Sequence, residues 1–258
     1  MKVIKSLGLT LLASFATASI AGYPLHDAVR SGSLDSVQRA LCDRRCDLSK
    51  HDGDGNTPLH LALLLLEDDT IAKFLHLNGG DVKATNNDGS TSLHIAACMG
   101  KVWEMRQLLI ARDSVDMQNV RGRTALHYTA LAAAIRNRPF DMQGVDVLLK
   151  VGAEVGIQDN DGRNPLHLVF TCRVDEIGGA DAVVRSLVRH SVDLEALDKC
   201  GDTPAHVGVR CLLIPVATIR LVLERGSRFT TGDSAFEFSA GWNTTSRPSA
   251  DYGNPSWS

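Results

Sequence analysis

Residues 89–122 read GSTSLHIAACMGKVWEMRQLLIARDSVDMQNVRG, and this stretch decides the fold. It opens on a Gly two residues before Thr91, and Leu93-His94 follow the Thr. A Gly permits the positive φ angle of a tight loop. A Thr hydroxyl accepts a backbone N–H at the start of a helix. The stretch therefore predicts a loop that leads directly into a capped helix.

The same unit recurs along the chain, at spacings of 34, 34, 33, 40 and 39 residues. Each unit contains one histidine after a Leu or Ala: His26, His60, His94, His127, His167 and His206. Five glycines keep step with them: Gly55, Gly89, Gly122, Gly162 and Gly201. Later in the unit, apolar residues such as Val145, Leu148 and Leu149 show helical spacing. Because one such unit is too small to bury its own apolar face, neighbouring units must cover it.

The period and the segment Thr57-Pro58-Leu59-His60 resemble the ankyrin repeat family. The resemblance covers six repeats, from residue 22 to about residue 230. It implies an all-α solenoid in which each repeat has two antiparallel helices and a projecting β-turn loop. Arg45 and Arg112 depart from the usual Gly after the second helix, and Ala205 replaces a core Leu.

The outer and inserted segments differ from the regular repeats. The first repeat has no turn loop before it and is expected to act as a cap. Repeats four and five carry about six extra residues, predicted to lie between their helices around residues 136–140 and 175–179. Residues 231–258 are rich in Ser, Gly, Thr and Pro, which predicts a loose tail. The tail also holds five aromatic residues, so partial packing is the alternative.

Residues 1–21 have the pattern of a secretory signal peptide. Lys2 and Lys5 precede an uncharged run from residue 7 to residue 20, and small residues lead to a cleavage site after Ala21. The alternative is a membrane anchor, but a spanning helix needs roughly 20 apolar residues. We therefore predict export, with secretion as the destination and the periplasm as the alternative, and no stable anchor after cleavage.

Charge and motifs exclude several classes of function. The chain has 27 Lys and Arg against 30 Asp and Glu, a net charge of −3, which argues against nucleic-acid binding. Metalloprotease, phosphate-loop and nucleophile-elbow motifs are missing from the sequence. The segment from Asp52 to Gly55 resembles half a calcium loop, but Leu63 stands where the loop requires Glu. We expect no cofactor and no catalysis; an enzyme with its site in the inserts or the tail is the distant alternative.

Histidine, cysteine and asparagine supply the remaining chemical candidates. The resemblance implies a structural role for the six repeat histidines, whose imidazoles bond the backbone near the Thr-Pro turn. Cys42 and Cys46 are four residues apart, so an oxidising compartment favours a disulfide between them, with free thiols as the alternative. Asn243 begins an N-glycosylation triplet in the tail.

In ankyrin-like proteins the partner usually lies across the loop tips and the inner face of the first helices. Four residues are predicted to put positive charge on the loop tips: Arg121, Arg123, Arg163 and Lys199. These basic tips form either a solvated rim or a docking site for an acidic segment. Trp103 is read either as a binding anchor or as a packing variant. The run from Leu61 to Leu66 is too apolar to be buried completely and predicts an exposed apolar strip. The candidate partner-binding residues are Arg121, Arg123, Arg163, Lys199, Trp103, Leu61, Leu64 and Tyr128.

These observations predict a secreted or exported protein–protein interaction module without catalytic activity. An effector-like binder of a host or external protein fits this description, and the chain alone is expected to be monomeric. A periplasmic protein that supports a partner enzyme is the alternative.

Overall fold

The structure is a computed structural model. It describes residues 23–42, 47–109, 115–136, 139–171 and 178–210, together with residues 220 and 222. Contacts divide the chain into two units, Met1–Ser227 and Arg228–Ser258, and every described residue belongs to the first. The predicted signal peptide (1–21) and tail (231–258) lie outside the described residues.

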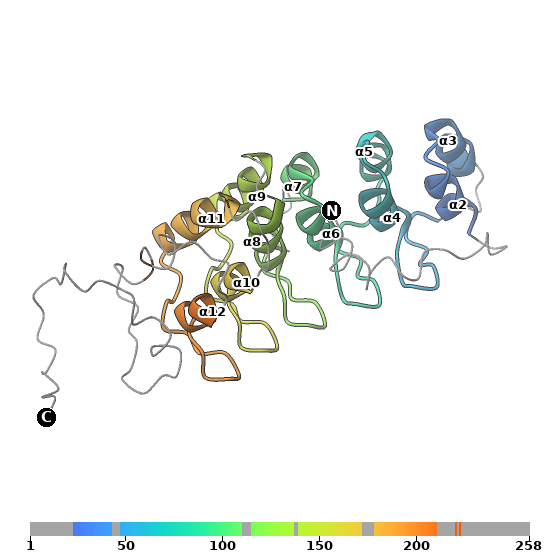
Figure 1. The fold of residues 1–258 in the computed structure, drawn as a ribbon. Coiled ribbons are helices and arrows are strands. Elements are labelled where there is room, and N and C mark those ends of the chain that lie inside the picture. Colours follow the sequence, from blue (N-terminus) through green and yellow to red (C-terminus); the bar gives the residue numbers. More distant parts are fainter. Residues whose placement is uncertain are drawn as a thin grey trace, which may run out of the picture. The chain divides into compact units, whose positions relative to one another are not determined.

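The described part of the chain is a row of helix pairs, which confirms the all-α prediction. The first helices of repeats 1 to 6 are α2 (Pro24–Arg30), α4 (Pro58–Leu65), α6 (Ser92–Met99), α8 (Ala125–Arg136), α10 (Pro165–Phe170) and α12 (Pro204–Arg210). The second helices of repeats 1 to 5 are α3 (Leu34–Cys42), α5 (Thr70–Leu77), α7 (Val102–Leu108), α9 (Pro139–Lys150) and α11 (Gly178–Arg189). Figure 1 shows the pairs in sequence order, with a loop projecting from each. Within the described ranges, the β pairing is one isolated bridge between Thr85 and Thr91.

The first helices of repeats 2 to 6 begin where the sequence pattern predicts, because each follows a Thr or Asn that caps it, whereas Tyr23 before α2 makes no side-chain cap bond. The Thr57 hydroxyl accepts the His60 N–H at the start of α4, and Pro58 occupies the first helical position. A proline suits that position because its missing N–H would have no partner there. Asn164 caps α10 in the same way. At the other end of α6, Gly100 adopts φ 71° and ends the helix in a left-handed turn.

The loop glycines are required for two reasons. Gly122 has φ 72°, and a Cβ atom placed on it would lie 2.7 Å from the backbone nitrogen of Asn160 in the next loop. Gly55 has φ 76°, and its Cβ would lie 2.6 Å from the backbone nitrogen of Asn87. Consecutive loops therefore stack so closely that only a glycine fits between their backbones.

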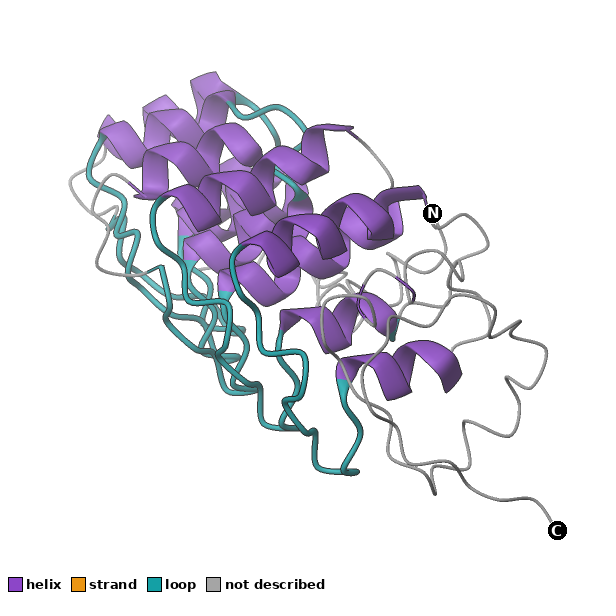
Figure 2. Cartoon of the chain, turned by 90° about the vertical axis from the view of Figure 1, so that its left-hand side faces the viewer, coloured by secondary structure: helices purple, strands orange, loops and turns teal. Residues whose placement is uncertain are grey.

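The extra residues of repeat 4 lengthen its helices, so the predicted insertion between the helices is wrong for this repeat. Helices α8 and α9 have 12 residues each, whereas α6 has eight and α7 has seven. The longer α8 runs through Ala132-Ala133-Ala134, and alanine has the highest helix propensity. The longer α8 packs against α9, α10 and α11. Figure 2 shows the helices gathered on one side and the loops on the other.

Candidate functional site

The repeat histidines close the helix caps. In repeat 4, the Thr124 N–H donates to Nδ1 of His127 at 3.1 Å, and the Thr124 hydroxyl lies 2.9 Å from the same nitrogen. The same N–H bond recurs in the repeats of His60, His94, His167 and His206. Because Nδ1 accepts the N–H, the proton of the neutral imidazole is on Nε2.

The other ring nitrogen ties each repeat to the next. Nε2 donates to a loop carbonyl of the following repeat from His26, His94, His127 and His167, at 2.9 to 3.1 Å. Burial lowers the pKa of His127 to about 4, so this imidazole is neutral at physiological pH. Burial lowers the pKa of His60 to about 4 as well, yet its Nε2 faces Ala84 and makes no hydrogen bond of normal geometry.

The loops form a continuous ladder beneath the helices. In the loop of repeat 5, Oδ1 of Asp159 accepts the N–H groups of Asp161 and Arg163 at 2.9 and 3.0 Å. Equivalent turns form at Asp52, Asn86, Asn119 and Asp198. Backbone bonds then join neighbouring loops, such as the N–H of Asn160 to the carbonyl of Arg121 at 2.8 Å.

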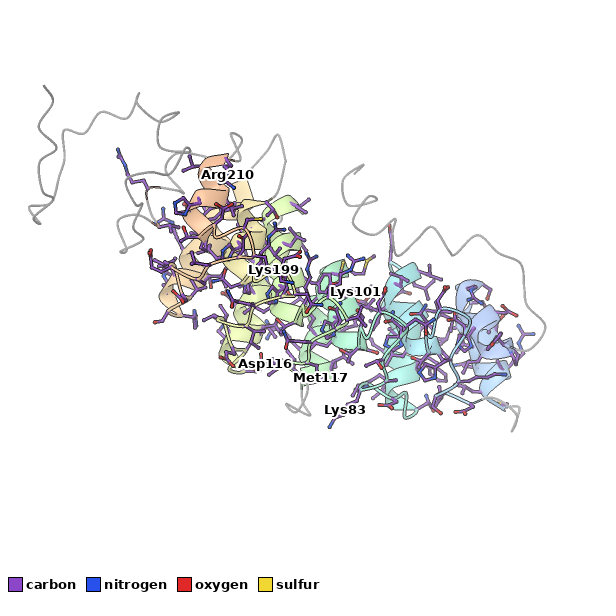
Figure 3. All side chains as sticks on the ribbon, turned by 90° about the horizontal axis from the view of Figure 1, so that it is seen from below. Lys83, Lys101, Asp116, Met117, Lys199 and Arg210 are labelled. Atoms are coloured by element: carbon purple, nitrogen blue, oxygen red, sulfur yellow. The ribbon has the colours of Figure 1, made fainter. Side chains whose placement is uncertain are left out.

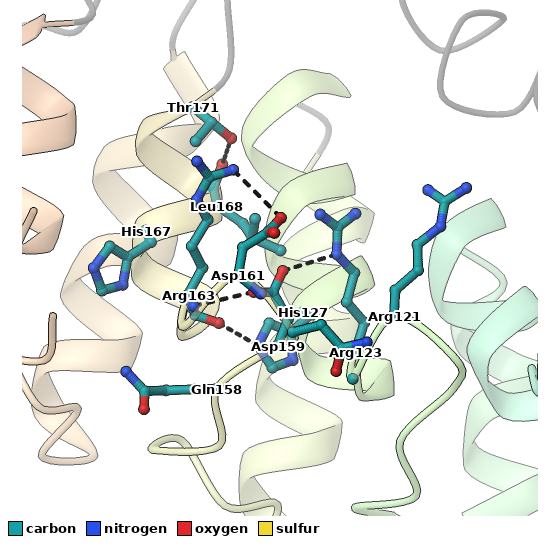
Figure 4. A network of polar contacts seen from close by, with 12 residues as sticks. Arg121, Arg123, His127, Gln158, Asp159, Asp161, Arg163, His167, Leu168 and Thr171 are labelled. Carbon is teal, nitrogen blue, oxygen red and sulfur yellow. Dashed lines mark hydrogen bonds and ion pairs between the residues drawn. The ribbon is translucent and has the colours of Figure 1, made fainter. Parts of the chain in front are cut away.

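A second set of contacts links the residue before each cap to the turn residue of the next repeat. The contact is neutral between repeats 2 and 3, where Asn86 Nδ2 donates to Asn56 Oδ1 at 3.1 Å. It becomes ionic between repeats 4 and 5, where Arg123 Nε lies 3.1 Å from Asp159 Oδ2. Between repeats 5 and 6, Arg163 pairs with Asp198 at 3.4 Å. Figure 4 shows the Arg123–Asp159 pair beside the bond from His127 to the Arg163 carbonyl.

These ion pairs show that two of the four predicted basic loop-tip residues are already paired within the chain. Arg123 and Arg163 do not form part of an open basic rim, because each is engaged by a carboxylate whose side chain is 1 to 2% exposed. Arg121 and Lys199 are exposed. Arg121 points away from the polar network in Figure 4, and Lys199 lies on the loop side of the molecule in Figure 3. Beside them, Val120 is 59% exposed and Leu197 is 57% exposed.

Glutamine side chains extend the loop ladder, which the sequence analysis missed. Nε2 of Gln118 donates to the carbonyls of Gly122 and Gln158. Nε2 of Gln158 repeats this with Gly162 and Leu197. The signal was available in the sequence, because each Gln directly precedes the turn residue at the repeat period.

The predicted apolar strip at Leu61 and Leu64 is wrong. Leu61 is 0% exposed and Leu64 is 6% exposed, because α4 lies between α2 and α6 and these helices cover most of its surface. Tyr128 is half-buried, and its hydroxyl accepts the Asn119 side-chain N–H at 2.9 Å, so it supports a loop. Burial raises the pKa of this hydroxyl.

Trp103 lies on the second helix α7, away from the loop tips. It is 43% exposed, and the ammonium of Lys73 stands 3.9 Å from its ring centroid. Both expectations for this residue therefore stay open: the side chain has a partner within the chain and still presents aromatic surface.

Other candidates lie beyond what is described or find no support there. Cys42 is described and exposed, but Cys46 lies outside the described residues, as does Asn243. Among the described residues, no cluster of three His, Cys, Asp or Glu is placed to hold a metal ion. Across the same ranges, no helix is long and apolar enough to cross a membrane.

Comparison with known proteins identifies the repeats. Residues 64–142 match the family model described as "Ankyrin repeats (3 copies)". The chain is 31% identical over 97 residues to a putative ankyrin repeat protein of Fowlpox virus, a match covering 38% of the chain and 20% of that protein. It is 38% identical over 98 residues to mouse NF-kappa-B inhibitor delta, covering 38% of the chain and 27% of that protein. The chain thus spans about a quarter or less of these relatives.

A solved structure supports the same fold. The crystal structure of an ankyrin repeat domain from Acinetobacter baumannii superimposes with a TM-score of 0.67 at 22% identity. The match covers 80% of this chain and 99% of that one. The chain therefore contains ankyrin repeats and has the ankyrin-repeat fold, as predicted. Ankyrin repeats indicate a protein–protein interaction module, and a binding partner that is itself a protein.

Proposed function

We propose that this ankyrin-repeat chain is an exported, non-catalytic module that binds another protein through the loop tips of its C-terminal repeats. The observation that carries the proposal is the pairing of exposed apolar and exposed basic side chains on a cross-linked loop ladder. Val120 and Arg121 provide such a pair on the loop of repeat 4, and Leu197 and Lys199 provide another on the loop of repeat 6.

The ladder beneath these tips favours binding because it is ordered before a partner arrives. The Arg123–Asp159 pair and the Gln118 bonds hold neighbouring loops together. A preorganised surface loses less conformational entropy when it associates than a mobile one does. Exposed apolar groups beside charged groups are also the usual composition of an interface.

The chemistry of the tips favours a partner segment that is acidic and partly apolar. Opposite charge speeds association and fixes orientation, while Val120 and Leu197 supply contact area. The tip between them carries Asn160 and Asp161, both exposed. A fitting segment therefore places carboxylates opposite Arg121 and Lys199 and a neutral or donor group opposite Asp161.

The test is affinity capture from the native compartment with a charge-reversed variant, Arg121→Glu/Lys199→Glu. We expect capture to fall several-fold at low salt and the loss to shrink as salt rises, because screening acts within about 10 Å at 0.1 M. The matched control is Arg106→Glu/Lys150→Glu, which reverses two exposed charges on second helices. Equal capture by both variants would contradict binding through the tips.

Export is proposed from the signal-peptide pattern of residues 1–21. An effector-like role outside the producing cell is our first choice, and a periplasmic protein that supports a partner enzyme is the alternative. N-terminal sequencing of the natural protein should begin at Gly22, within two residues. A chain that begins at Met1 would contradict export and leave the tip test unaffected.

A further inference from the structure

The loop ladder places one residue of each repeat in a regular row, two residues after the turn residue. The backbone carbonyl of each of these residues accepts an N–H of the following loop, at 2.8 to 3.1 Å. We call them the tip row: Asp54, Asp88, Arg121 and Asp161. Because the same backbone bond fixes every member, the row advances by one position per repeat along the loop side of the molecule (Figure 2).

The tip row changes sign between repeats 3 and 4. Asp54 and Asp88 are half-buried on the loops of repeats 2 and 3, whereas Arg121 is exposed on the loop of repeat 4. Arg30, whose charge acts on Asp54, already pairs with the buried Asp52 at 2.9 Å. Burial and the carboxylates of Asp52 and Asp88 raise the pKa of Asp54. The earlier tips therefore present negative charge where the later tip presents positive charge.

The spacing of the row favours one backbone conformation in a complementary segment. Packed helices lie roughly 8–10 Å apart, and the loops keep the same spacing because backbone bonds join them one to one. A polyproline II segment has three residues per turn and rises about 3.1 Å per residue, so every third side chain points the same way about 9 Å further along. In a β-strand, side chains on one face recur about 7 Å apart. The polyproline II period matches the row, and the strand period does not.

We propose that the tip row binds a polyproline II segment of the partner, with basic residues on Asp54 and Asp88 and an acidic residue on Arg121. The three charged residues recur at every third position of the segment. This inference rests on the proposed function, because the acidic residue is the one that contacts Arg121. Charge order supplies specificity, since like charges placed opposite one another oppose binding. A polyproline II segment is already extended when free, so it loses little conformational entropy on binding.

The experiment measures binding of fluorescein-labelled peptides to the full chain by fluorescence anisotropy at low salt. The first peptide has two lysines and one glutamate, in that order, at every third position, with proline at the positions between them. The second peptide has the same charged residues at every fourth position. We expect the first peptide to bind saturably and at least about fivefold tighter than the second, because only the period of three keeps the charges on one side.

A variant of the acidic tips tests the charge order. Asp54→Asn/Asp88→Asn should weaken binding of the first peptide about fivefold, since one exposed ion pair contributes at most about fivefold in affinity. The matched control is Asp35→Asn/Asp181→Asn, which removes two carboxylates from the second helices α3 and α11. Far-UV circular dichroism checks the fold of both variants. The ladder bonds of Asp54 and Asp88 use backbone atoms, so we expect the loops to stay intact.

Three results would overturn the proposal. They are no saturable binding of the first peptide at millimolar chain, equal affinity for the two peptides, and equal binding by the tip variant and its control. None of these results contradicts the proposed function. That function fails instead when Arg121→Glu/Lys199→Glu captures the natural partner as well as the parent chain does.

Discussion

The seam between repeats 2 and 3 and the seam between repeats 4 and 5 follow one plan and are held together differently. At the later seam, Arg123 pairs with Asp159 and His127 donates to the next loop. At the earlier seam, the equivalent link is neutral, between Asn56 and Asn86, and His60 Nε2 faces Ala84 without a hydrogen bond of normal geometry. The other buried polar atoms of the described residues that make no hydrogen bond of normal geometry, in His76, Ser92 and Glu104, also belong to repeats 2 and 3.

This contrast shows what a repeat period determines and what it leaves to individual residues. The period places equivalent positions opposite one another in every seam. The residues at those positions then decide whether the seam is closed by charges and hydrogen bonds or left with unsatisfied groups. In a solenoid, stability is approximately a sum of repeat and interface contributions, so a weak seam is a local property.

The largest expected effect comes from the repeat histidines. His127→Ala leaves the buried Thr124 N–H and the Arg163 carbonyl unsatisfied, and we expect it to lower the free energy of unfolding by about 3 kcal/mol. His60→Ala should cost about 2 kcal/mol, because His60 makes no cross-repeat hydrogen bond of normal geometry. Urea unfolding of both variants measures the difference. Equal losses would mean that the cross-repeat bond contributes nothing.

A smaller effect is expected from the ladder residues before the caps. Arg123→Ala leaves a buried Asp159 oxygen without its charged donor and should cost about 2 kcal/mol. Asn56→Ala removes a neutral bond at the earlier seam and should cost about 1 kcal/mol. The cycle of Arg123→Ala with Asp159→Asn isolates the pair energy. A coupling energy near zero would show that the Arg123–Asp159 pair contributes nothing to stability.

The last effect, comparable in size with those of the ladder residues, depends on pH and acts at the earlier seam. The pKa of Glu104 is raised from 4.5 to about 7, so its contribution to stability is complete below pH 4.5 and is lost as pH rises through 7. Glu104→Gln cannot ionise and should be more stable than the parent by about 1–2 kcal/mol at pH 8, with little difference at pH 4.5. Thermal unfolding at the two pH values tests this. A variant that is less stable at pH 8 would contradict the sign.

The sequence predicted the repeat framework well because its signals are local. Thr57-Pro58 and Asn164-Pro165 mark helix starts within a few residues, and the glycines mark the loops. The burial and pairing of the candidate partner-binding residues were predicted less well because these properties are not local. The sequence predicts an exposed charge at Arg123, because its partner Asp159 lies 36 residues away in the chain.

Because burial is not local, the exposure of Leu61 and Leu64 was predicted wrongly and the buried Glu104 was not predicted. Leu61 and Leu64 were expected on the surface because one repeat cannot cover them, but the two flanking repeats do. Glu104 was not singled out, although its spacing of four residues from Leu108 places it on the buried face of α7.

Native-state hydrogen exchange tests the contrast between the seams most directly. The amide of Asn87 donates across the earlier seam to Asp54 at 3.1 Å, and the amide of Asn160 donates across the later seam to Arg121 at 2.8 Å. These two amides occupy equivalent loop positions, so their protection compares the seams alone. We predict that Asn87 exchanges through an opening of lower free energy than Asn160. Equal protection, or stronger protection of Asn87, would contradict the account.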